Sequence, residues 1–252
     1  MKIDHPKTEQ IPALRTLWQE VFGDSDDFLD SFFAYGFACS HCLCAMEQEK
    51  MAGAMYWLDH TCRGKKLAYL YAVATHPDYR GQGICRRLTH QVTALLREQG
   101  YAGIILVPAQ PGLVSMYEKL GFSPASPLGL LRCSRGETPT PLRAVGPQEY
   151  NALRNRLAPE GSALLGEQAL RFLASQAEFF AGDGWVLAAW RQDQTLTGLE
   201  YLGSTSLLPG IVNALSCIRG SFRIPGADQP FAMFTALSPG ENCPSHVGFA
   251  FD

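Results

Sequence analysis

The stretch Leu67–Gly83, LAYLYAVATHPDYRGQG, decides the fold of this chain. Its first part, Leu67–Val73, is apolar or aromatic throughout and predicts a buried strand. The loop Arg80–Gly83 then leads directly into a helical pattern over Ile84–Gln99. Because the two glycines of this loop carry no Cβ atoms that would block close approach, successive backbone N–H groups can converge on an anion at the start of the helix. The strand, loop and helix therefore predict a pyrophosphate-binding site.

The composition is that of a folded, globular protein. The chain has 252 residues, of which 46% are hydrophobic and 18% charged, which suits one large or two small domains. A net charge of −3 gives no overall basic field, so we expect no nucleic-acid partner. No apolar run approaches the ~20 residues of a membrane-spanning helix, and the first ten residues lack a signal-peptide core, so we expect a cytoplasmic protein with no membrane partner.

Eight cysteines raise the question of disulfides or a metal site. In the cytoplasm we expect them to be reduced. Cys39, Cys42 and Cys44 have a C-x2-C-x-C spacing, with His41 and His60 as further possible zinc ligands. However, no second cysteine pair stands at a zinc-finger distance, and the residues after Cys42 fit a buried strand in which cysteine acts as a small hydrophobe. We therefore expect no metal.

The chain before the opening stretch predicts two helices and a hairpin. Apolar residues at three- and four-residue spacing predict a helix over Ile11–Phe22, ended by Gly23. Ser25 or Asp24 then caps a second helix, which is rich in phenylalanine. Two apolar strands joined by a polar turn follow, at Cys42–Met46 and Met51–Leu58.

After the opening stretch we expect a short strand at Ile104–Val107 and a helix that begins at Pro111 and ends at Gly121. Residues 123–147 are rich in proline, glycine, serine and threonine, which predicts a linker. Leu128–Cys133 within it also fits a last strand of the first sheet. We place one domain at 1–135, a linker at 136–141 and a second domain at 142–252.

The second half repeats the order helix, helix, hairpin, and we interpret this as a weak internal duplication. Its hairpin segment Ala188–Leu202 resembles Ala45–Leu58. Only about half a dozen residues then precede the next helix, too few for a second long strand and phosphate loop, so we expect a single cofactor site in the first half. The other elements predicted in this half are helices through Leu170–Phe180 and Leu208–Ile218 and strands at Phe231–Leu237 and Val247–Phe251.

Two motifs resemble the GCN5-related N-acetyltransferases, the GNAT superfamily. The segment Ala74–Cys85, ATHPDYRGQGIC, is similar to the R/Q-x-x-G-x-G/A signature, and Met116–Phe122, MYEKLGF, is similar to the Y-x-x-x-G-F element. The resemblance covers Ile11–Cys133, about half the chain. It implies an α/β (α+β) fold with a mixed, mostly antiparallel sheet flanked by helices, followed by a second, smaller and degenerate GNAT-like half.

The resemblance also implies a chemistry: transfer of an acetyl group from acetyl-CoA directly to a primary amine of a small molecule or peptide. Tyr117 matches the general acid that protonates the departing CoA thiolate, although periodicity alone also fits a core tyrosine. Cys85 stands where the signature has glycine or alanine, and Gln110 where many relatives have asparagine. Backbone groups would hold the pantetheine and the pyrophosphate of the co-substrate, and the matching residues are Val73, Thr75, Arg80, Gly81, Gln82, Gly83, Ile84 and Cys85.

The general base stays open. Some family members keep a carboxylate in the strand before the loop, whereas Tyr69 and Tyr71 stand there in this chain. Asp59, His60, the terminal carboxylate of Asp252, or a water molecule are the alternatives.

Arg86 and Arg87 fit either solvated helix residues or contacts to the 3′-phosphate of CoA. An alternative to catalysis is a non-catalytic acyl-CoA sensor or assembly module. A nucleotide-binding α/β domain is a third interpretation, but the chain lacks the G-K-[ST] of a P-loop. The acceptor and the oligomeric state have no signature in the sequence.

Overall fold

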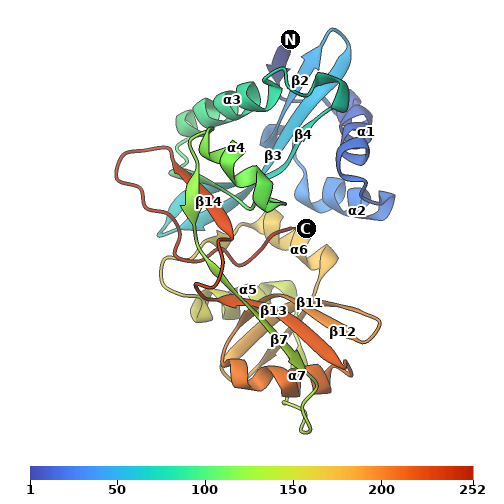
Figure 1. Ribbon diagram of the computed structural model, residues 1–252, viewed down its shortest axis with the longest axis vertical. Coiled ribbons are helices and arrows are strands. Elements are labelled where there is room, and N and C mark those ends of the chain that lie inside the picture. Colours follow the sequence, from blue (N-terminus) through green and yellow to red (C-terminus); the bar gives the residue numbers. More distant parts are fainter. Residues whose placement is uncertain (252) are drawn as a thin grey trace. The chain divides into compact units, whose positions relative to one another are not determined.

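The computed structural model describes residues 1–251, which form two compact units (Figure 1). The first unit comprises residues 1–123, 166–172 and 233–243, and the second holds the remaining described residues. These units do not coincide with the predicted domains 1–135 and 142–252. The boundary falls at Ser123 instead of in the predicted linker 136–141, and two segments from the second half of the sequence pack within the first unit.

The first unit is built on a mixed sheet in the order β1-β2-β3-β4-β5-β14. Among the described strands of this series, every neighbouring pair is antiparallel except β4 and β5, which run parallel. A short strand, β6 (Ser123–Ala125), leads out of the unit. The strands span β1 (Lys2–Asp4), β2 (Cys42–Glu47), β3 (Lys50–Cys62), β4 (Lys65–Thr75), β5 (Gly103–Leu106) and β14 (Ala232–Ala236).

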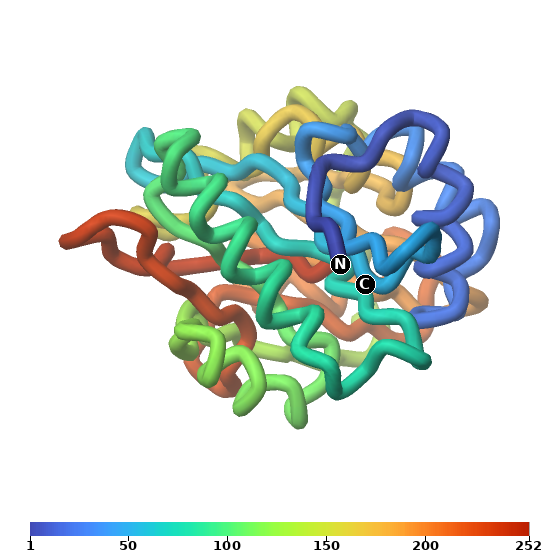
Figure 2. The backbone as a smooth tube through the Cα atoms, turned by 90° about the horizontal axis from the view of Figure 1, so that it is seen from above, coloured from blue at the N-terminus to red at the C-terminus, as the bar shows by residue number. Residues whose placement is uncertain are grey.

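Helices cover both faces of this sheet, as Figure 2 shows for α3 on one side and α1 with α2 on the other. The apolar residues of the helix α3 (Ile84–Glu98) recur at helical spacing, so they form one stripe, which is buried against the sheet. The short α4 (Val114–Glu118), entered through a 3-10 turn at Pro111–Leu113, packs into the same core. The helices α1 (Ile11–Phe22) and α2 (Asp26–Ser31) close the opposite face.

Aromatic rings fill the space between α1, α2 and the sheet. The Trp18 ring lies 4.6 Å from that of Phe32, 5.2 Å from that of Tyr56 and 5.6 Å from that of Tyr71, measured between centroids. Phe172, from the part of the later helix α6 that belongs to this unit, lies 5.3 Å from Phe32. Large buried rings contribute most of the apolar area in such a core. This packing explains why residues 166–172 join the first unit.

The local helix signals of the sequence are confirmed. Gly23 ends α1 in the left-handed conformation with φ 75°, which glycine adopts without strain. Ser25, one of two predicted caps, is the N-cap of α2, and its hydroxyl accepts a hydrogen bond of 3.3 Å from the Phe28 N–H.

The second unit carries a six-stranded sheet in the order β7-β13-β12-β11-β10-β8. Its helices are α5 (Pro147–Leu157), the later part of α6 (Glu167–Gln176) and α7 (Leu208–Ala214), and a short strand, β9, spans Leu164–Leu165. The strands of the sheet are β7 (Leu128–Ser134), β8 (Arg143–Ala144), β10 (Glu178–Gly182), β11 (Trp185–Gln192), β12 (Thr195–Leu202) and β13 (Arg219–Pro225).

Several predictions for this half are wrong. Leu128–Cys133 does not close the first sheet, because β7 pairs with β13 of the second unit. Phe180 lies in β10 instead of the helix predicted over 170–180, and α7 stops at Ala214 so that the missed strand β13 can begin at Arg219. Residues 247–251 are buried but form no strand. These errors share a cause, since strand pairing partners lie far apart in the sequence.

The two units share one strand arrangement. In each, a bulged antiparallel hairpin is followed by a helix and a strand parallel to the hairpin's second member: β3-β4-α3-β5 and β11-β12-α7-β13. The register shifts lie at Ala54/Tyr56 in the first hairpin and at Ala188/Ala189 in the second. This correspondence agrees with the duplication inferred from the sequence.

A buried ionic cluster occupies the core of the second unit. The Arg154 side chain, fully buried, donates from Nε to Glu200 Oε2 at 2.6 Å and from its second terminal nitrogen to Oε1 at 3.0 Å. His246 Nε2 lies 2.9 Å from Glu200 Oε1, and the Tyr150 hydroxyl donates to Oε2 at 3.2 Å. Burial alone would raise the pKa of Glu200, but the attraction of Arg154, with the help of His246, lowers it to about 2.

Replacing this carboxylate, Glu200→Gln, leaves the Arg154 charge buried without its partner. We expect a loss of about 3–5 kcal/mol of unfolding free energy at neutral pH, measured by urea denaturation. Because the pKa of Glu200 is lowered from 4.5 to about 2, its stabilisation is complete above pH 4.5 and is lost as the pH falls toward 2. The difference between wild type and variant therefore shrinks over that range.

The matched control is Glu178→Gln, because Glu178 pairs with Arg191 at 2.6 Å but both side chains are exposed. We expect that change to cost within about 1 kcal/mol. Equal losses for the two variants would contradict the assignment of Glu200 as a buried, structural charge.

Candidate functional site

The sheet of the first unit opens between β4 and β5. The two strands pair only over Leu67–Tyr69 and Gly103–Ile105, whereas β4 continues to Thr75 with β3 as its neighbour. Among the described residues, the strand pairing of β4 on its β5 side thus ends at Tyr69. A strand edge released in this way presents backbone N–H and C=O groups to an extended ligand.

A bulge reshapes β4 just where it leaves β5. The register against β3 shifts between Ala54 and Tyr56, and Ala72 adopts φ 46°. A non-glycine residue in this conformation is uncommon and turns its peptide groups away from the regular ladder. Val73 and Thr75, predicted to pair with a pantetheine, lie on the strand directly after this bulge.

The glycine loop brings open N–H groups to the start of α3. Gly83 is the N-cap of this 15-residue helix, with φ 75° and no side-chain cap, so the first N–H groups of the helix have no intrahelical partner. Such groups, with the helix dipole, form an anion site. Gly81 also has φ 76°, and space is open where a Cβ would stand at either glycine. Within the protein itself, the glycines are therefore required for the left-handed conformation and not for lack of space.

The chain's own side chains hold this loop. Arg80 Nε donates to the Thr75 carbonyl at 3.4 Å, and the Gln82 amide donates to the Asp78 carbonyl at 3.2 Å. Arg87 donates to the Gln82 carbonyl at 2.8 Å. Of the two arginines considered for the 3′-phosphate, Arg87 thus braces the loop backbone, whereas Arg86 lies exposed on the surface.

A groove with a volume of about 430 Å³ lies beside the loop, between α3 and the end of α4. Three of its lining side chains carry basic groups: Arg86, His90 and Lys119. Sequence reasoning found Arg86 and missed the other two. Residues four apart lie on one helix face, so the position of Arg86 could have indicated that His90 lies beside it. No sequence pattern indicates Lys119, which reaches the groove only through the packing of α4.

Tyr117 lies in the core behind the loop. Its side chain is 7% exposed, and its ring meets Phe122 edge-on at 5.9 Å. Burial, with a smaller contribution from nearby Cys85, raises the pKa of Tyr117 above its ordinary value. Burial likewise raises the pKa of the Cys85 thiol. Tyr117 therefore keeps its proton at neutral pH, which is the state a proton donor needs.

The candidates for a general base are placed differently. Asp59 accepts a hydrogen bond of 2.5 Å from the Tyr101 hydroxyl, and it stands opposite Ala68, near the hairpin end of β4. The His60 residue faces Leu67 in the register of β3 and β4, and its ring is 3% exposed and stacks at 5.4 Å on that of Tyr69, the last residue of β4 that pairs with β5. Asp252 lies outside the described residues.

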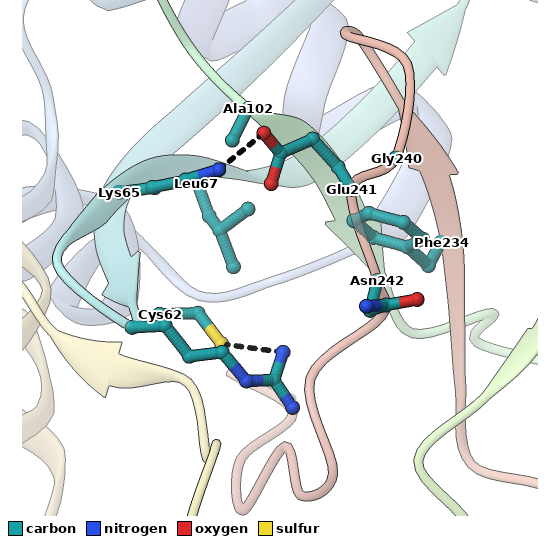
Figure 3. Close-up of a pocket in the computed structure, with 9 residues that line it drawn as sticks. Cys62, Lys65, Leu67, Ala102, Phe234, Gly240, Glu241 and Asn242 are labelled. Carbon is teal, nitrogen blue, oxygen red and sulfur yellow. Dashed lines mark hydrogen bonds and ion pairs between the residues drawn. The ribbon is translucent and has the colours of Figure 1, made fainter.

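A second, smaller cavity of about 120 Å³ opens at the other end of β4 (Figure 3). Leu67 and Phe234 line it, and Lys65 forms an ion pair of 2.6 Å with Glu241 above it. At about 3.3 Å per strand residue, the start of β4 lies roughly 33 Å from its end at Thr75. This cavity is therefore separate from the glycine loop.

Among the described residues, no group of three or more histidine, cysteine, aspartate or glutamate side chains is placed to hold a metal ion. Cys42 and Cys44 are buried on β2, where they pack as small apolar residues. No helix in the described part of the chain has the length and apolar character needed to cross a membrane.

The strand opening and the glycine loop lie on one α/β domain, within residues 2–125. Residues 2–125 match the family described as "Acetyltransferase (GNAT) domain". Residues 2–125 form a domain of the GNAT superfamily of acetyltransferases, and this domain carries the predicted signature and the Y-x-x-x-G-F element. The predicted fold class, a mixed and mostly antiparallel sheet flanked by helices with a second α/β half, is confirmed.

Similar curated proteins match over part of their length. N-acetyltransferase 8 of Mus musculus is 38% identical over 61 residues, which cover 23% of this chain and 27% of the mouse protein. N-acetyltransferase 8B of Homo sapiens is 32% identical over 116 residues, which cover 44% of this chain and 46% of the human protein. The matches thus span about a quarter to a half of these relatives.

Solved structures share the fold over nearly the whole chain. A GCN5-related N-acetyltransferase from Anabaena variabilis aligns with a TM-score of 0.73 at 16% identity, and the alignment covers 94% of this chain and 73% of the Anabaena chain. A tandem GNAT protein from the clavulanic acid biosynthesis pathway aligns with a TM-score of 0.54 at 10% identity, and the alignment covers 95% of this chain and 100% of the tandem protein's chain. At these identities the likeness concerns the fold alone.

Replacing the N-cap glycine, Gly83→Ala, forces a side chain into the left-handed region where space is open. We expect a loss of about 1–2 kcal/mol of unfolding free energy, measured by urea denaturation, from backbone strain. Gly112→Ala is the control, since space is also open there and its φ is not positive. A loss at Gly112 as large as that at Gly83 would contradict the conformational role of Gly83.

Proposed function

We propose that this chain is an acetyl-CoA-dependent N-acetyltransferase that moves the acetyl group directly to a primary amine of a small molecule or peptide. The single observation that supports this best is the open edge of β4 leading into a loop whose helix has no side-chain cap. The open edge of β4 would bind an extended amide-bearing chain, and the loop at the start of α3 would bind a pyrophosphate.

The binding roles follow the order of the chain. Backbone groups of Val73 and Thr75, beyond the bulge, would pair with the pantetheine amides. The N–H groups from Arg80 to Cys85 would hold the pyrophosphate, and the hydrogen bonds from the Arg80 and Gln82 side chains to the backbone keep that segment in place. These contacts come mainly from the backbone, so they depend on conformation more than on side-chain identity.

The basic groove extends this site. The 3′-phosphate of CoA carries negative charge that a guanidinium and an ammonium group bind well. Arg86 is the third residue of α3 and lines the groove with His90 and Lys119, so it lies next to the helix start that would hold the pyrophosphate. Arg86 and Lys119 would therefore contact the 3′-phosphate.

Acetyl-CoA supplies an activated thioester, and the protein positions the amine and manages protons and charge. Tyr117 would donate its proton to the sulfur as the carbon–sulfur bond breaks, and its burial keeps that proton in place beforehand. A backbone N–H at the bulge of β4 would stabilise the negative charge that develops on the carbonyl oxygen. Asp59 stands one register position nearer the strand opening than His60, but its carboxylate accepts a hydrogen bond from Tyr101, whereas the His60 ring stacks on Tyr69 at the opening.

The test of this function is binding and turnover with acetyl-CoA. We expect isothermal titration calorimetry to detect acetyl-CoA binding, and a panel of primary amines to release CoA thiol, measured with a thiol reagent. The absence of binding at millimolar acetyl-CoA would refute the proposal. Tight binding with no thiol release from any amine would favour an acyl-CoA sensor instead.

Tyr117→Phe removes the proton donor while keeping the ring packed on Phe122. We expect turnover to fall about a hundredfold or more, within the range for a positioned acid, with nearly unchanged acetyl-CoA affinity. Tyr79→Phe is the control, because Tyr79 is a tyrosine of the loop that packs on the same core. An unchanged rate for Tyr117→Phe would remove Tyr117 from the mechanism.

Arg86→Ala tests the basic groove. We expect CoA affinity to fall about tenfold while dephospho-CoA affinity changes little, because a charge-assisted hydrogen bond contributes roughly 1.5–3 kcal/mol. Arg97→Ala is the control on the same helix, where Arg97 donates to the Leu237 carbonyl at 2.9 Å in the last turn. Equal losses for CoA and dephospho-CoA would place the 3′-phosphate elsewhere.

A further inference from the structure

The second unit repeats the strand opening of the first. Its parallel pair β12–β13 ends at Gly198 and Phe222. Beyond that point β12 stays with β11, where Glu200 pairs with Ala188, and β13 stays with β7, where Arg223 pairs with Leu130. Both units therefore contain two parallel strands that part after a short run of pairing.

The tail segment, Pro244–Phe251, contacts both strands beyond the point where they part. His246 lies 2.9 Å from Glu200 of β12, and Arg223 of β13 lies 3.5 Å from the Ala250 carbonyl. All of its residues except Ser245 are buried. A buried piece of the chain thus lies against both strands beyond the point where they part.

The contacts are of the kind that proteins use to bind peptides. The Ala163 N–H donates to the His246 carbonyl at 2.9 Å, and the Ser245 N–H donates to the Gly161 carbonyl at 3.0 Å. Backbone hydrogen bonds of this kind give affinity, and pockets for side chains give specificity. The tail-binding surface consists of Arg154, Gly161, Ala163, Glu200 and Arg223.

Three tail residues, His246, Gly248 and Phe249, contact this surface in ways that depend on the identity of the residue. A Cβ added at Gly248 would stand 1.6 Å from Glu200 Oε1, so a side chain does not fit there. The Phe249 ring lies 4.9 Å from the Arg154 guanidinium, in a cation–π contact. Because a carboxylate only accepts hydrogen bonds, the His246 ring donates to Glu200. The surface is therefore specific for the sequence His-x-Gly-Phe, which is residues 246–249 in this chain.

We propose that the second unit is a peptide-binding module whose tail-binding surface binds Pro244–Phe251 of the same chain as a ligand. The opening between β12 and β13 then binds no acyl-CoA. The Glu200 carboxylate is buried where β12 leaves β13, and only Gly203–Leu207 separates β12 from the seven-residue α7. Each chain then has one acyl-CoA site. The peptide-binding part stands whether or not the proposed function does.

The experiment cuts the tail from the protein after folding. A protease recognition sequence placed between Asn242 and Cys243, which are both exposed, allows the full chain to fold before cleavage. We expect the released peptide to remain bound during gel filtration and to exchange with a labelled peptide of residues 244–252. A Gly248→Val peptide is expected to bind at least about tenfold more weakly, because overpacking of a close contact is costly. A Ser245→Ala peptide is the control: it loses one exposed hydrogen bond, from the Ser245 hydroxyl to the Glu160 carbonyl, and should bind only about two- to fivefold more weakly.

The outcomes separate a ligand from a fixed part of the core. If the tail-free protein keeps its fold, or regains it on addition of peptide, and discriminates against the Gly248→Val peptide, the proposal holds. It is overturned if the tail-free protein binds no labelled peptide, or if it unfolds and added peptide does not restore it. Calorimetry with CoA before and after tail removal adds a second arm, in which a second equivalent of bound CoA would contradict the claim of one site per chain.

Discussion

A parallel strand pair that stops after three residues forces the longer strand to find other partners for its backbone groups. In the first unit β4 meets this demand on one side through β3, and the bulge at Ala72 turns its other side away from the ladder. The loop and α3 follow directly, so their position depends on where β4 leaves β5. The aromatic packing of Trp18 and Tyr71 on the opposite face holds that strand in place.

The second unit shares the strand pattern but differs in what lies against it. Its strands part in the same way, and beyond that point the tail segment contacts the side chains of Glu200 on β12 and Arg223 on β13. Glu200, close to the point of parting, is buried and needs cations and donors around it. Arg154, Tyr150 and His246 provide them, and one of the three comes from the tail. A single strand arrangement thus accommodates two kinds of occupant.

The sequence predicted what local chemistry determines. Gly23 and Ser25 could be predicted as helix ends because the conformation of the one and the hydrogen bond of the other involve only neighbouring residues. In the structure Gly23 ends α1 and Ser25 caps α2. The strand, loop and helix from Leu67 onward were predicted for the same reason. The failures concern distant partners: the pairing of β7 with β13, the place of Lys119 beside α3, and the hydrogen bond that links Tyr101 to Asp59. The binding residues predicted from the motifs stay predictions.

Charged residues show most clearly why sequence reasoning stops where it does. Glu178 and Glu200 both lie on strands of the same sheet, and neither has a distinctive neighbour in the sequence. In the structure the first forms an exposed ion pair with Arg191, whereas the second is the centre of a buried cluster. The difference arises because β10 pairs with β8 only at Phe180 and Ala181, which leaves Glu178 at an open edge, whereas a segment more than forty residues later covers Glu200. Burial of a charge is thus a property of the assembled fold, since the desolvation cost is met only by groups that folding brings together.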